Sequence, residues 1–184
     1  EKNSQSQPPS TIGFGLNHNN QACTFLFQNN ILSATTEINM AQQLDPQLSI
    51  AHCNAALIHL FNEDYTKAKQ SLDTAKKTNQ YLDIIYLNEG LLFYKTGHIK
   101  ESISCFQQSY KINPKNIHVN YNLAMAYFKD NNIELCINYI KPLYAYGLFF
   151  IPLEKQFHCL EKNPFIVEDR LSPKVSNELC QLFN

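Results

Sequence analysis

The sequence predicts an all-α solenoid built from stacked helix–turn–helix units of equal length. The first observation is that asparagine recurs every 34 residues, at Asn20, Asn54, Asn88 and Asn122. The second is that small residues keep the same interval, at Ala22, Ala56, Gly90 and Ala124. The third is that each interval holds two apolar helical patterns separated by a polar break. A fixed period of this length is typical of stacked helical hairpins.

The period divides the chain into an arm, four units and a cap. Residues 1–14 are polar and rich in Ser and Pro, which predicts a linker or a disordered arm. The four units are expected at 15–48, 49–82, 83–116 and 117–150. The period is lost after them, and three prolines at helix-start positions predict a helical capping segment over 151–184. About eleven helices are expected in all.

Within each unit, turn residues separate a first helix from a second helix. The predicted turns lie at 29–30, 62–64, 96–98 and 130–132, and they consist mainly of Asn, Asp and Gly. These residue types tolerate left-handed backbone or bond to their own main chain. A second series of small residues marks the second helices, at Ala34, Ala68, Ser102 and Cys136. We expect Gly90 and its equivalents to let the two helices of a unit approach closely.

Composition excludes several classes of protein. A net charge of −1 and a pI near 6.7 give no basic field for nucleic acid. The longest apolar run, 143–153, is too short to insert into a membrane. The six cysteines form no CxxC, so no metal site is expected. Free thiols favour the cytoplasm; the alternative is an exported or membrane-tethered protein carrying a segment before residue 1.

The sequence predicts neither catalysis nor a cofactor. His52 precedes Cys53 and His158 precedes Cys159, but neighbours on a helix point in different directions. The glycines at 13 and 15 lack the third glycine and the preceding strand of a phosphate-binding loop. No paired carboxylates suggest acid–base chemistry, so we do not expect this chain to be an enzyme.

The repeat pattern resembles that of the tetratricopeptide repeat (TPR) family over residues 15–150. Unit three matches at Tyr86, Gly90, Phe93, Gly97, Ile99, Phe106 and Pro114. Unit two matches at Ala56, Asp64, Tyr65, Ala68 and Ala75. The resemblance implies a right-handed superhelix whose inner groove is lined by the first helix of each unit.

The resemblance also implies which side chains face a ligand. At the groove offsets this chain carries mostly apolar and aromatic residues, including Cys53, Leu57, Leu87, Leu91, Tyr94, Tyr121, Met125 and Phe128. We expect these side chains to form an exposed apolar strip. Such a strip suits an amphipathic helix or an extended apolar segment of another protein. The offsets at which some TPR proteins clamp a terminal carboxylate hold apolar residues here, so that mode of binding is not expected.

Two interpretations of the four asparagines stay open. Their amides could form a ladder that bonds the main chain of a bound peptide. Alternatively, asparagine at this offset could stabilise the packing of the helices. It is also open whether the groove is filled by the cap or by the arm of this same chain.

The function expected from the sequence is therefore a scaffold or adaptor that binds another protein. One alternative is a self-associating structural module whose end faces stack between copies, giving a homo-oligomer. A second alternative is an accessory domain of a larger enzyme.

Overall fold

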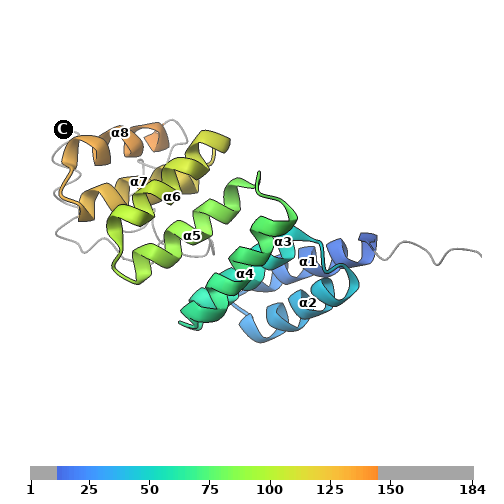
Figure 1. The fold of residues 1–184 in the computed structure, drawn as a ribbon. Helices are drawn as coiled ribbons and strands as arrows, with labels where there is room; N and C mark the ends of the chain where they lie inside the picture. Colours follow the sequence, from blue (N-terminus) through green and yellow to red (C-terminus); the bar gives the residue numbers. More distant parts are fainter. Residues whose placement is uncertain (1–11, 145–184) are drawn as a thin grey trace, which may run out of the picture.

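The computed structural model of the protein describes residues 12–144, which form eight helices in four hairpins (Figure 1). In chain order these are α1 (Ile12–Phe27), α2 (Ile31–Leu44), α3 (Ser49–Phe61), α4 (Tyr65–Thr78), α5 (Asp83–Lys95), α6 (Ile99–Ile112), α7 (Ile117–Lys129) and α8 (Ile133–Tyr144). All secondary structure in this range is helical, which confirms the predicted all-α class. None of the described helices combines the length and apolar composition needed to cross a membrane.

The predicted boundaries differ from the structure at the start of the array. Helix α1 begins at Ile12, so 12–14, which the sequence analysis placed in the polar arm, are helical. Ile12 and Phe14 continue the helical pattern N-terminal to Gly15, and neither residue ends a helix. The rest of the predicted arm, the end of unit four at 145–150 and the predicted cap at 151–184 lie outside the described residues.

The hairpins stack in sequence order. Each second helix packs on its own first helix, and α2, α4 and α6 also pack on the first helix of the next unit. In addition, α3 contacts both α1 and α5, and α5 contacts α7. The first helices of successive units therefore lie side by side, as expected for a solenoid (Figure 1).

The four turns share one conformation at one offset of the repeat. Asn29, Glu63 and Asn131 have φ between 57° and 59°, and Gly97 has a φ of 82°. In every turn the next backbone N–H donates to a carbonyl five residues back, over N···O distances of 2.8–2.9 Å. This bond satisfies one of the free carbonyls at the end of the first helix. The left-handed turn residues expected from the sequence are confirmed at Asn29, Gly97 and Asn131, whereas in unit two Glu63 adopts this conformation.

Small residues mark the helix crossings. An added Cβ at Gly90 would lie 2.3 Å from Phe106 Cε1, and Phe106 is fully buried. Helix α6 thus approaches α5 closely because Gly90 has no side chain, which confirms the predicted crossing. The other small residues of the two series are likewise buried, at Ala22, Ala34, Ala56, Ala68, Ser102, Ala124 and Cys136.

Candidate protein-interaction site

The side-by-side first helices bring three of the four repeated asparagines into buried positions. Asn54 in α3, Asn88 in α5 and Asn122 in α7 have exposed fractions of 1%, 0% and 0%. Asn20 in α1 is exposed, and its Oδ1 lies 3.5 Å from Asn19 Nδ2. The sequence prediction of four equivalent asparagines is therefore wrong for Asn20. The described residues contain no first helix before α1 against which Asn20 could pack.

The buried asparagines link neighbouring first helices. Asn88 Nδ2 donates to the backbone carbonyl of Cys53 at 3.0 Å, which joins α5 to α3. Asn54 Nδ2 donates to Asn19 Oδ1 at 2.8 Å, and it also lies 3.4 Å from Cys23 Sγ. Asn54 thus joins α3 to α1. These contacts support the interpretation in which asparagine at this offset stabilises helix packing.

The side-chain oxygen of each of these two asparagines has no hydrogen-bond partner. Asn54 Oδ1 and Asn88 Oδ1 are buried and accept no hydrogen bond. An unpaired buried acceptor costs free energy, about 1–3 kcal/mol relative to a paired one. Such groups are uncommon in folded proteins, and each calls for an explanation.

The apolar residues predicted to line a groove are buried side chains. Cys53, Leu57, Leu87, Leu91, Tyr94, Tyr121 and Met125 have exposed fractions of 5% or less. Phe128 is partly buried and packs on the same cluster. The expectation of an exposed strip is therefore wrong. These side chains belong to one continuous apolar core that includes residues of all eight described helices.

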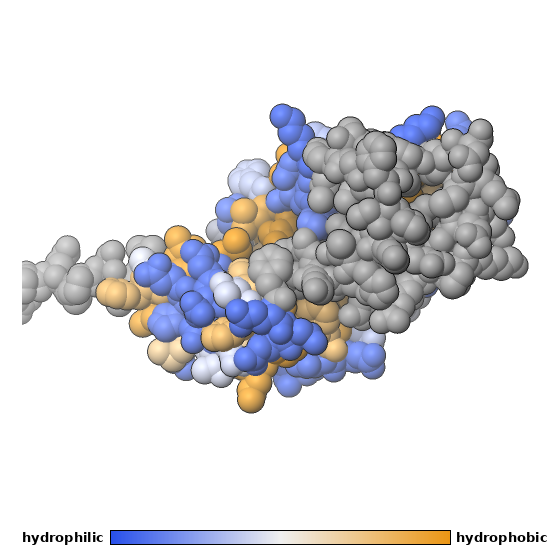
Figure 2. All heavy atoms as spheres, turned by 180° about the vertical axis from the view of Figure 1, so that it is seen from behind, coloured by the Kyte–Doolittle hydropathy of each residue, from blue (hydrophilic) through white to orange (hydrophobic). Residues whose placement is uncertain are grey.

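The exposed apolar residues of the described range lie elsewhere. They are Phe14, Leu16, Leu32, Met40, Phe61, Tyr81 and Ile112, and Leu32 is the most exposed, at 81%. In the coloured part of Figure 2, hydrophobic residues alternate with hydrophilic ones. Single exposed apolar residues are ordinary on a folded surface and do not by themselves mark a site.

The outer face of unit one is polar, whereas the faces by which later units dock are mostly apolar. Unit one carries Asn17, Gln21 and Thr24, all exposed. At the same offsets, units two to four carry nine buried residues, and all of them except Glu89 are apolar: Ala51, Ala55, Ile58, Ile85, Glu89, Leu92, Val119, Leu123 and Ala126. This polar face gives no support to end-to-end stacking of copies through unit one.

The described cysteines are free thiols in unreactive surroundings. Burial raises the pKa of Cys53 to about 12 and the pKa of Cys136 to about 11. His52 does not face Cys53, because its ring bonds to Gln42 Nε2 at 3.0 Å and to the carbonyl of Pro46 at 2.9 Å. A thiol with a raised pKa and no base is a poor nucleophile. The pair His158–Cys159 lies outside the described residues.

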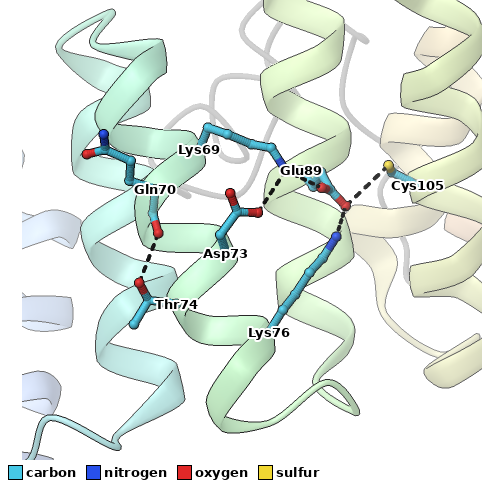
Figure 3. Close-up of polar contacts among 7 residues, drawn as sticks. All are labelled: Lys69, Gln70, Asp73, Thr74, Lys76, Glu89 and Cys105. Carbon is cyan, nitrogen blue, oxygen red and sulfur yellow. Dashed lines mark hydrogen bonds and ion pairs between the residues drawn. The ribbon is translucent and has the colours of Figure 1, made fainter.

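One polar cluster was missed by the sequence analysis. Glu89 in α5 is 6% exposed, and it is contacted by Lys69 and Lys76 of α4 and by Cys105 of α6 (Figure 3). The sequence did carry a signal for it, since the apolar residues Ala55 and Leu123 occupy the offset of Glu89 in the neighbouring units.

No group of three or more His, Cys, Asp or Glu within 12–144 is arranged to hold a metal ion.

Comparisons with known proteins agree with this architecture. The tetratricopeptide repeat family matches residues 84–116, which are nearly all of unit three. No curated protein matches the sequence.

Solved structures share the fold at low sequence identity. PilW, a widely conserved type IV pilus biogenesis factor, superposes with a TM-score of 0.66 at 19% identity over 91% of this chain and 78% of its own. PilF of Pseudomonas aeruginosa superposes with a TM-score of 0.66 at 14% identity, over 95% of this chain and 77% of the PilF chain.

An O-GlcNAc transferase of Thermobaculum terrenum gives a TM-score of 0.65 at 16% identity, over 74% of this chain. The match spans only 27% of that enzyme. At these identities the likeness establishes the fold. The tetratricopeptide repeat family is thus matched over unit three, and the described residues form four helical hairpins that stack in one register, as in these solved structures.

Proposed function

We propose that this protein is a scaffold or adaptor that binds a peptide or amphipathic helix of another protein on the face formed by α3, α5 and α7. The tetratricopeptide fold is a protein–protein interaction module, and its side-by-side first helices provide a continuous surface. The absence of a basic field makes a protein segment a better fit than nucleic acid.

The observation that carries the proposal is the pair of unused acceptors, Asn54 Oδ1 and Asn88 Oδ1. They belong to equivalent residues of adjacent units, so their spacing follows the stacking of the helices. A bound main chain offers N–H donors independently of its sequence. Pairing each acceptor with such a donor recovers the free energy lost by leaving it unpaired.

Binding requires this face to open, because its apolar side chains are buried. Leu57, Leu91 and Met125 flank the asparagines along the first helices and have exposed fractions of 3% or less. A partner therefore binds by replacing contacts that already cover these residues. The apolar side chains of the partner then supply the burial, while Asn54 and Asn88 fix its main chain.

The test uses peptides selected from a displayed random library on the full chain. The double variant Asn54→Ala/Asn88→Ala is expected to bind the selected peptides more weakly, by about 1–3 kcal/mol of binding free energy, since it lacks both acceptors. Asn20→Ala is the matched control, because it changes the same residue type at the same offset where the side chain is exposed. Circular dichroism must show that all variants are folded.

Selected peptides that bind the double variant and the wild type equally would contradict the proposal, as would a library that yields no binding peptide.

The likeness to an O-GlcNAc transferase supports a second candidate. This chain matches 27% of that enzyme, so an array of this kind occurs as one part of a larger catalytic chain. An accessory role in a larger enzyme predicts that the full reading frame encodes a catalytic domain beside these repeats. A reading frame without one removes this candidate.

A further inference from the structure

Glu89 is a buried carboxylate at the junction between unit two and unit three. Its Oε2 lies 2.5 Å from Lys76 Nζ, and its Oε1 lies 3.3 Å from Lys69 Nζ (Figure 3). The thiol of Cys105 lies 3.6 Å from Oε2 on the side of α6. The carboxylate is therefore held between α4 and α6, with both of its oxygens in ion pairs.

The two lysines are placed to converge on one carboxylate. They lie seven residues apart on α4, about two turns, so they project from one face of that helix. Lys76 also lies 5.2 Å from the centre of the Tyr86 ring of α5. Lys69 is shared with Asp73, at 2.8 Å. Lys76 is the less exposed of the two lysines.

A charge at this offset is exceptional within the chain. The equivalent positions hold Gln21 in unit one, Ala55 in unit two and Leu123 in unit four. A buried ion pair is often no more stabilising than an apolar contact of similar size, so stability alone does not account for Glu89. Removal of one partner of such a pair is strongly destabilising, because the remaining charge stays buried.

The lysines are specific to unit two. The offsets of Lys69 and Lys76 are occupied in the other second helices by Thr35 and Gln42, by Ile103 and Tyr110, and by Ile137 and Tyr144. If unit three docked on any of those helices, Glu89 would be buried without a counter-charge. Among the second helices described here, α4 alone carries lysines at these two offsets.

The other junctions use different chemistry at the same offsets. Between units one and two, Gln42 bonds to His52. Between units three and four, Tyr110 meets Tyr139 edge to face at 5.5 Å, and Tyr139 stacks on Tyr127 at 5.6 Å. Each junction thus carries its own set of contacts, although the helices around them have similar lengths and patterns.

We propose that Glu89, Lys69 and Lys76 form an ionic recognition set that directs unit three to dock on unit two and on no other unit, of the same chain or of a second copy. Repeats with similar apolar faces can pair out of order or exchange between molecules. A buried carboxylate excludes wrong pairings, because each of them leaves it unpaired. This role is independent of the peptide-binding function proposed above.

The first experiment is a charge reversal in the full chain. Glu89→Lys places three lysines together and is expected to speed hydrogen exchange of the α5 amides by about 100-fold, the change that corresponds to breaking a buried pair. Lys69→Glu/Lys76→Glu/Glu89→Lys restores opposite charges and is expected to return most of that protection. Lys77→Glu is the matched control, since it changes an exposed lysine of the same helix.

Equal loss of protection in Glu89→Lys and in the triple variant would overturn the proposal, as would equal loss in Lys77→Glu. If Glu89→Lys does not fold, the yield of folded protein is compared instead. The proposal then requires the triple variant to fold.

A second experiment tests specificity apart from stability. Glu89→Leu removes the charge and supplies the residue type of unit four at this offset. It is expected to fold, and on refolding at rising protein concentration to form at least several-fold more exchanged dimer than the wild type, measured by light scattering after gel filtration. An unchanged fraction of dimer would show that the ionic set does not select the pairing.

Discussion

The left-handed turn residues show how the repeat tolerates unequal side chains at one position. Asn29, Gly97 and Asn131 are residue types that enter this region readily, whereas Glu63 is not. A non-glycine residue pays a steric penalty there, which is smaller for asparagine because its side chain bonds locally. Glu63 therefore holds its conformation because the surrounding turn requires it.

Replacement of this glutamate should stabilise the protein. Glu63→Gly is expected to raise the free energy of unfolding by up to about 1 kcal/mol, because the relief of left-handed strain exceeds the entropy cost of glycine. Urea denaturation measures the change. Gly97→Ala is the converse control, since its φ is 82° and an added Cβ would meet nothing within 4 Å. A lower urea midpoint for Glu63→Gly would contradict this explanation.

Individual residues also show what the sequence could and could not predict. Gly90 was predictable, because a small residue at a repeated crossing has one structural explanation. The difference in burial between Asn20 and Asn88 was not predictable, since it depends on whether another first helix lies alongside. Glu89 could have been found by comparing the four units offset by offset, although its partners on α4 required the structure.

The starts of the second helices differ in how well they are capped. Asn30 accepts from the backbone N–H of Ser33, Asp64 from that of Lys67 and Asn132 from that of Leu135, at 3.1–3.2 Å. His98 occupies the same offset before α6 and makes no capping bond. Its ring instead contacts Thr96 Oγ1 at 3.0 Å and packs edge to face on Phe93.

Helix α6 should therefore gain from a better cap. His98→Asp is expected to raise the free energy of unfolding by about 1 kcal/mol, because aspartate can accept from the backbone at the start of the helix. Asn30→Ala, which removes an existing cap, should lower it by a similar amount. Thermal or urea melts compare the two. A destabilised His98→Asp would mean that the contacts of the ring with Thr96 and Phe93 outweigh the missing cap.

At the level of elements, periodicity predicted the helices better than their surroundings. The eight described helices and their turns follow from apolar spacing and turn residues. The start of α1 could not be predicted in this way, because Ile12 and Phe14 precede the glycine that was taken as the boundary. The burial of Leu57, Leu87 and Leu91 could not be predicted either, since sequence offsets identify a helix face without showing what packs against it.

At the scale of the whole stack of described units, units two and three are joined by two adjacent residues of one helix. Asn88 and Glu89 are adjacent in α5, and they bind α3 and α4 respectively. One turn of α5 thus fixes unit three against both helices of unit two. The face proposed for binding and the ionic junction therefore use adjacent residues of one helix.

The measurement that tests this account most directly is the set of distances between spin labels placed just after the C-terminal ends of the first helices. Asn62, Thr96 and Asp130 are exposed, equivalent residues of units two, three and four. Labels introduced there as unnatural amino acids leave the native thiols unused. Pulsed electron resonance is expected to give similar 62–96 and 96–130 distances and a clearly longer 62–130 distance. A 62–130 distance equal to or shorter than the other two would contradict the stacking of the units in one register.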